Sequence, residues 1–206
     1  MRRLALALAA SSILAAPAVL AQTAAPAARS GPSQDPAAAQ AGTYALDERH
    51  ASVTAKVSHF GFSNYTFQFR GVDGTLVYDP RKLTASRVTF TVDPKTIDTG
   101  LAEFDKELAG DDWLGSTPAR FVSTALHPTG PRTGRLVGDL TLKGVTRPAS
   151  FNVTFNGGGA NMRGTPTLGF TAEGVIDRTQ FGVNKYAGPV GKDVRLSIEA
   201  EFNKPK

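Results

Sequence analysis

The stretch Val194-Arg195-Leu196-Ser197-Ile198-Glu199-Ala200-Glu201-Phe202 alternates apolar and polar residues without a break. Successive side chains of a β-strand point to opposite faces, so this period of two predicts a strand with one dry and one wet face. A functional site of such a protein has to lie on the apolar face, inside the sheet.

The same alternation recurs through the chain after residue 50. Turn signals such as Asp73-Gly74, Asp79-Pro80 and Gly157-Gly158-Gly159 separate the alternating runs. Together with a short first strand near 44–46, about eight or nine strands follow one another. We therefore predict an all-β domain, an eight-stranded antiparallel up-and-down barrel, because closure removes exposed sheet edges.

One segment departs from the strand pattern. Leu101, Phe104 and Leu108 have the spacing of one face of a short helix, with Thr99 as its predicted N-cap. This insertion either plugs one end of the barrel or forms a lid over a ligand mouth, with Trp113 packing over the entry. The sequence leaves both interpretations open.

The chain divides into three parts. Residues 1–21 combine a basic start, an apolar run and the cleavage pattern Val19-Leu20-Ala21, which predicts a signal peptide and export to the periplasm. Residues 22–42 are rich in Ala, Pro, Gln and Ser, and we predict a disordered linker there. Residues 43–206 form the barrel domain.

Composition excludes several classes of protein. Cysteine is absent, so the fold has no disulfide and no thiolate metal site. The formal net charge of +5 includes two signal-peptide arginines, and the remaining basic residues are scattered along the chain. A nucleic-acid-binding protein gathers its basic residues on one face, so we expect no nucleic acid partner. We find no phosphate-loop, nucleophile-elbow or zinc-protease motif.

Two polar residues are candidates for contact with a ligand. His59 has the inward parity of its strand, where it is either a hydrogen-bonded core residue or a contact for a ligand head group. Arg178 follows a predicted strand, where it either pairs with a carboxylate such as Asp177 or binds a carbonyl or anionic head group. A lipid-modifying periplasmic enzyme is an alternative function, and its only candidate pair is His59 with Glu107 or Asp105.

An outer-membrane barrel is a further alternative, since it shares export and alternation. Such a barrel normally ends on an aromatic residue within its membrane belt, whereas this chain continues past Phe202 into polar residues.

The inward faces carry more aromatic side chains than a barrel of this bore can easily pack without gaps. Eight-stranded barrels are either filled by their side chains or hold one small ligand. The inward small residues Gly138, Ala172 and Gly174 either enlarge such a cavity or relieve crowding between rings, and both interpretations stay open. The inward aromatic residues are Phe67, Phe69, Phe90, Phe121, Phe151, Phe155 and Phe170.

The sequence resembles a known family, the YceI-like or lipid/polyisoprenoid-binding proteins. The resemblance spans about residues 44–202 and rests on several fragments in the same order. These fragments are Tyr44–Val53 with His59 and Gly61, Phe69–Gly71, Gly74–Pro80, Thr96–Gly100, Asp105–Leu108, Gly138–Pro148 and Asp177–Gly182.

The resemblance implies a lipocalin-like barrel that is exported and holds one long apolar ligand, a polyisoprenoid or isoprenoid quinone, without a covalent cofactor. It implies a non-enzymatic role in transport, storage or stress response. It also implies that the protein forms a homodimer and makes transient contact with a membrane surface. Two departures concern the lid: Glu107 stands where many members carry His, and Asp112–Pro118 is shorter than usual. The expected ligand-binding residues are His59, Phe67, Phe69, Phe90, Trp113, Leu140, Phe170, Ile176, Arg178 and Phe181.

Overall fold

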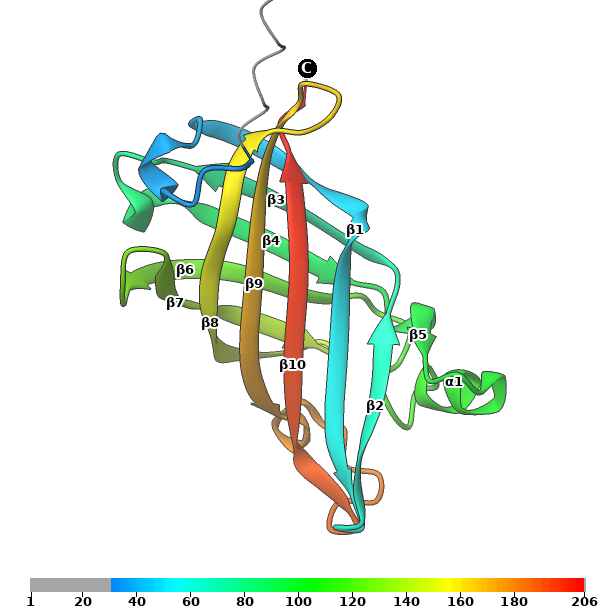
Figure 1. Ribbon diagram of the computed structural model, residues 1–206. Helices are drawn as coiled ribbons and strands as arrows, with labels where there is room; N and C mark the ends of the chain where they lie inside the picture. The colour runs from blue at the N-terminus through cyan, green and yellow to red at the C-terminus, as the bar shows by residue number, and fades with distance from the viewer. Residues whose placement is uncertain (1–30, 206) are drawn as a thin grey trace, which may run out of the picture. The chain divides into compact units, whose positions relative to one another are not determined.

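A computed structural model describes residues 31–205 of the chain, and Figure 1 shows their arrangement as a strongly curved antiparallel sheet. Almost all of the regular structure is β, as predicted. The only α-helix in this part of the chain is α1, Ala102–Leu108. The strands are β1 (Gly42–His59), β2 (Ser63–Phe69), β3 (Val72–Tyr78), β4 (Arg87–Val92), β5 (Ile97–Asp98), β6 (Ala119–Pro128), β7 (Thr133–Leu142), β8 (Val145–Ala160), β9 (Pro166–Asp177) and β10 (Val190–Asn203).

The sheet closes on itself through the pairing of β1 with β10. The ring runs β1, β3, β4, β6, β7, β8, β9 and β10, so eight antiparallel strands form the barrel, which confirms the predicted fold. β2 continues the path of β3 along β1, so that the first part of β1 pairs with β3 and its last part, Val53–His59, pairs with β2.

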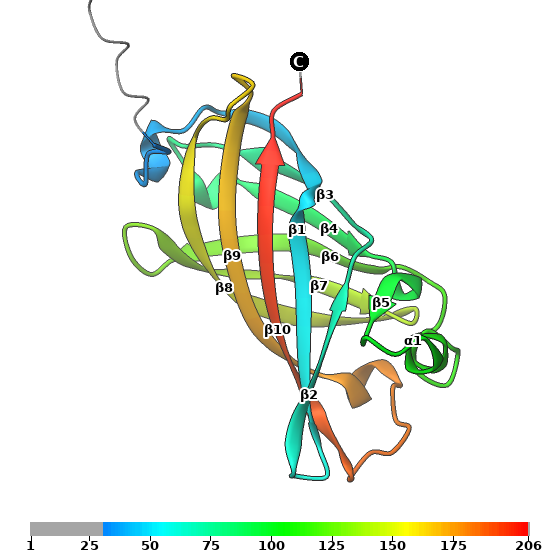
Figure 2. The ribbon, with the colours of Figure 1, turned by 45° about the vertical axis from the view of Figure 1, so that its right-hand side comes forward.

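The wall differs at the two ends of the barrel. On its outer side β2 pairs only with β5, through Gln68 and Phe69. The remaining residues of that edge, from Ser63 to Phe67, have no strand partner on this side among the described residues. Helix α1 follows β5, and Figure 2 shows both beside the end of the barrel where the β1–β2 hairpin lies.

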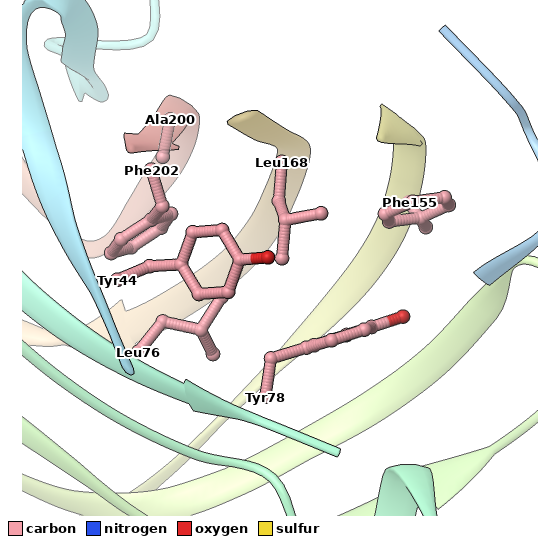
Figure 3. Packing of buried hydrophobic residues seen from close by; sticks show 7 residues of the cluster. All are labelled: Tyr44, Leu76, Tyr78, Phe155, Leu168, Ala200 and Phe202. Carbon is pink, nitrogen blue, oxygen red and sulfur yellow. The ribbon is translucent and has the colours of Figure 1, made fainter. Parts of the chain in front are cut away.

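The opposite end is filled by a compact apolar cluster, which we call the closed end (Figure 3). The two tyrosine hydroxyls in it are satisfied by backbone carbonyls: Tyr44 donates to the oxygen of Gln40 at 2.8 Å and Tyr78 to that of Pro36 at 2.9 Å. The cluster consists of Tyr44, Leu76, Tyr78, Phe155, Leu168, Ala200 and Phe202.

The prediction of a disordered linker over 22–42 is wrong for residues 31–41. Pro36 is buried, Ser33 forms a β-bridge with Gly158, and Asp35 caps a short 3-10 helix, Pro36–Ala38. Composition predicted disorder because the segment lacks large apolar residues, but Tyr78 offers a buried hydroxyl that its backbone satisfies. Residues 22–30 and the predicted signal peptide lie outside the described residues.

The start of the helix also differs from the prediction. The N-cap of α1 is Leu101, which makes no side-chain capping bond, and not Thr99. Thr99 instead fixes the preceding turn, since its amide and its hydroxyl both donate to Asp105 Oδ1 at 2.7 Å. Across residues 31–205, none of the helices has both the length and the apolar character needed to cross a bilayer.

Candidate functional site: an apolar cavity inside the barrel

The barrel encloses a cavity of about 550 Å³, within the size range of small-molecule sites. Its wall is formed by the inward positions that alternation predicted, such as Val53, Ala55 and Val57 on β1, and Leu196 and Ile198 on β10. Both β10 side chains are only half-buried although they point inward. Inward side chains that keep accessible surface are expected around a cavity and not in a close-packed core.

Nine of the ten residues predicted to contact a ligand line this cavity. The exception is Phe181, which is 3% exposed and belongs to one apolar cluster with Trp113 and Val183. The nine lining residues are His59, Phe67, Phe69, Phe90, Trp113, Leu140, Phe170, Ile176 and Arg178.

One end of the cavity is bordered by exposed residues, and we call this end the mouth. It is bordered by His59, Phe104 and Tyr186, which line the cavity and are nevertheless exposed, Phe104 to 41% and Tyr186 to 60%. The mouth lies at the end of the barrel that carries the β1–β2 hairpin, because His59 is the last residue of β1. This hairpin is at the bottom of the ribbon in Figure 2.

Arg178 lies at the wall but is only 5% exposed. Its Nε donates to the Gly191 oxygen at 2.9 Å and its Nη2 to that of Val190 at 2.9 Å. Its Nη1 donates to the oxygens of Val183 at 2.6 Å and Lys185 at 3.0 Å. Four of its five donors therefore hold the loop 182–191. This is neither of the roles that the sequence suggested, since no bond to Asp177 is present.

His59 ends β1 at the mouth and is exposed, with its ring edge-on to Phe60 at a centroid distance of 4.7 Å. It is therefore not a buried core histidine. The described residues include no hydrogen bond from His59 to either carboxylate of the enzyme alternative. Asp105 accepts from Thr99, and Glu107 accepts from other donors.

Helix α1 borders the cavity through Phe104, Glu107 and Leu108, which agrees with the lid interpretation. Glu107 Oε1 accepts from Lys185 Nζ at 3.0 Å and from Trp113 Nε1 at 3.2 Å. These bonds, the one from Lys185 foremost, lower the pKa of Glu107, and the bond to Glu107 raises the pKa of Lys185. One carboxylate thus joins α1, the segment after it and the Arg178 loop 182–191.

The small inward residues serve two different purposes. A Cβ at Gly138 would lie 2.3 Å from the Val122 oxygen and 2.6 Å from the ring of Phe121, and one at Gly174 would lie 2.6 Å from the ring of Phe151. These two glycines relieve crowding between backbone and rings. Ala172, by contrast, lines the cavity.

Sequence reasoning missed Tyr65. Its ring lines the cavity, and its hydroxyl is buried without a hydrogen-bond partner. The signal was present, because Tyr65 shares the inward parity of Phe67 and Phe69 on the same strand. Over residues 31–205, no cluster of His, Cys, Asp and Glu is suited to hold a metal ion.

Comparison with known proteins shows which family has this sequence and fold. The model of the YceI-like domain matches residues 44–202. A UPF0312 protein of Pseudomonas fluorescens (strain SBW25) is 37% identical over 171 residues, which cover 81% of this chain and 88% of that protein.

Two solved structures have the same fold. One is BcnA of Burkholderia cenocepacia, with a TM-score of 0.68 and 24% identity over 76% of this chain and 98% of that one. The other is a polyisoprenoid binding domain from Saccharophagus degradans implicated in plant cell wall breakdown. Its TM-score is 0.57, with 14% identity over 81% of this chain and 100% of that one.

Proposed function

Since the chain belongs to the YceI-like family, we propose that it is a non-enzymatic protein that binds one long apolar ligand inside the barrel. The ligand class is a polyisoprenoid, an isoprenoid quinone or a similar lipid, carried or stored in the periplasm. The solved domain from Saccharophagus degradans, which is named for polyisoprenoid binding, supports this ligand class.

The observation that carries the proposal is the accessible apolar wall around a cavity of about 550 Å³. A hydrocarbon chain gains about 0.8 kcal/mol for each methylene that it buries. Such a wall therefore suits a long apolar tail, and the opening at His59, Phe104 and Tyr186 gives the tail an entry.

The direct test is organic extraction of protein purified without detergent from its own host, followed by mass spectrometry. We expect one class of long apolar molecule in the extract. The stripped protein should also bind added geranylgeraniol, which the fluorescence of Trp113, the only tryptophan, reports from the cavity wall. An empty extract, together with no binding by the stripped protein, would contradict the proposal.

Export is the second part of the proposal. The protein in the exported fraction of the host should begin at or near Gln22, because the cleavage pattern ends at Ala21. N-terminal sequencing of that fraction checks this, and an intact Met1 there would exclude cleavage.

Transient contact with a lipid surface is the third part. Phe62 is 92% exposed and Phe60 56% exposed on the hairpin beside the mouth, where a ligand would pass between protein and bilayer. Phe62→Ser should reduce sedimentation with phosphatidylglycerol vesicles. Met162→Ser is the matched control, because Met162 is equally exposed but lies in the β8–β9 turn. Equal effects of both variants would argue against a specific contact.

Light scattering in the same buffers tests the predicted homodimer.

A further inference from the structure

We infer that the hydroxyl of Tyr65 is the hydrogen-bond partner for an uncharged oxygen at the head of the ligand. The inference rests on the proposed function, and it names the group that selects among apolar ligands. The hydroxyl is buried without a partner in a wall that is mostly apolar. Buried hydroxyls in proteins nearly always have a hydrogen-bond partner, and leaving one unsatisfied is destabilising, so a bound ligand is the natural partner for Tyr65.

The other tyrosines show how unusual this arrangement is in the chain. Tyr44 and Tyr78 donate to backbone carbonyls at the closed end, and Tyr186 is 60% exposed. The chain has four tyrosines, and only Tyr65 combines a buried hydroxyl with no partner in the described structure.

Tyr65 is also at the right depth for a head group. It pairs with Val57 across β1, two residues before His59 at the mouth. Its ring lies 6.4 Å from that of Phe104 on α1 and 6.3 Å from that of Phe67, centroid to centroid. A ligand whose oxygen meets Tyr65 would therefore have its head under the lid, and its tail would extend toward the closed end.

Apart from His59, which is exposed at the mouth, the polar groups named there above already have partners. Trp113 Nε1 and Lys185 Nζ both donate to Glu107, and Arg178 uses four donors on the loop 182–191. A buried phosphate would need unpaired cations, and both of these cations have partners. The site therefore suits a neutral oxygen, such as a quinone carbonyl or an alcohol.

The experiment compares Tyr65→Phe with Tyr78→Phe, since each removes one hydroxyl from a tyrosine that lines the cavity. The probes are geranylgeraniol, the hydrocarbon with the same chain, and geranylgeranyl phosphate, followed by quenching of Trp113. Wild type should bind the alcohol more tightly than the hydrocarbon and the phosphate. Tyr65→Phe should lose about tenfold in affinity for the alcohol, equivalent to about 1.4 kcal/mol, and keep its affinity for the hydrocarbon.

Stability provides the second measurement. Tyr65→Phe should leave the melting temperature of the stripped protein unchanged or raise it, because no internal bond is lost. Tyr78→Phe should lower it and keep the preference for the alcohol, since its bond to Pro36 is structural.

Several results would overturn the inference: an unchanged preference in Tyr65→Phe, a fall in its melting temperature as large as that of Tyr78→Phe, or tighter binding of the phosphate than of the alcohol. If no probe binds wild type at all, the proposed function fails, which is a distinguishable outcome.

Discussion

Arg178 illustrates how a single side chain can organise the region beside a binding site. Its guanidinium is 5% exposed and donates to four carbonyl oxygens, all in the loop 182–191. The centre of its guanidinium also lies 5.7 Å from the ring centroid of Trp113, within the range of a cation–π contact. Arg178 therefore supports the cavity wall by fixing the loop and the tryptophan.

We expect Arg178→Met to destabilise the protein by about 2–4 kcal/mol, because it leaves four carbonyls without their donor. Arg178→Lys should not restore stability, since an ammonium cannot reproduce the planar fork. Denaturant unfolding measures both, with the exposed Arg195→Met on β10 as the control. Unchanged stability, combined with a selective loss of affinity for an oxygen-bearing ligand, would instead indicate that Arg178 binds the ligand head group.

At the scale of elements, two segments of different kinds lie at the two ends of the barrel. Helix α1 borders the mouth, and Glu107 attaches it to Trp113 and Lys185 by side-chain bonds. Residues 31–41 cover the closed end, where Tyr78 bonds the backbone of Pro36. The first attachment depends on charge, whereas the second does not, so the two should respond differently to pH.

The lid contact should weaken in acid. The pKa of Glu107 is lowered, so its contact with Lys185 is fully formed above the ordinary glutamate value of about 4.3 and is lost as the pH falls below it. The pKa of Lys185 is raised, so the contact is also lost above the ordinary lysine value of about 10.4.

Trp113 fluorescence should report the acid transition because its indole donates to Glu107. Glu107→Gln keeps an acceptor for Trp113 but removes the charge, and should abolish the transition. Asp112→Asn is the control, since Asp112 lies 4.0 Å from Lys185 without bonding Trp113. An identical transition in Glu107→Gln would assign it to another group.

Residues 31–41 should contribute measurably to stability. A chain that starts at Gly42 should melt about 3–8 °C below one that starts at Gly31, because it loses the bond to Tyr78 and the burial of Pro36. Differential scanning calorimetry of the two chains checks this. Equal melting temperatures would support the linker that composition predicted.

At the scale of the whole molecule, the barrel separates stability from binding. The closed end is a packed cluster of rings, with Tyr78 stacked on Phe155 at 6.4 Å. The rest of the interior is a cavity whose wall keeps accessible surface. Side chains of the same type should therefore have different roles at the two places.

Phe155 and Phe67 provide a matched comparison. Phe155→Ala should cost about 3–5 kcal/mol, because its ring is 4% exposed and packed on all sides. Phe67→Ala should cost clearly less in the stripped protein, since its ring is half-buried at the cavity wall, but should weaken ligand binding. Denaturant unfolding with and without geranylgeraniol measures both. Equal losses in the stripped protein would mean that the barrel interior is packed throughout.

The sequence alone determined which side chains face the interior. The alternation in 194–202 and its repeats predicted the barrel and inward residues that line its cavity, such as Phe67, Phe90 and Phe170, since a strand's geometry places every second side chain on one face. This property depends only on neighbouring residues, so it can be read without knowing which strands pair.

Only the tertiary structure decided what the polar groups do. Tyr78 and Pro36 are 42 residues apart in the chain, and Lys185 and Glu107 are 78 apart. Tyr65 on β2 and Phe104 on α1 are 39 residues apart in the chain, and their rings lie 6.4 Å apart. A hydrogen bond needs its partner within about 3 Å, and barrel closure and loop packing decide which partners come that close.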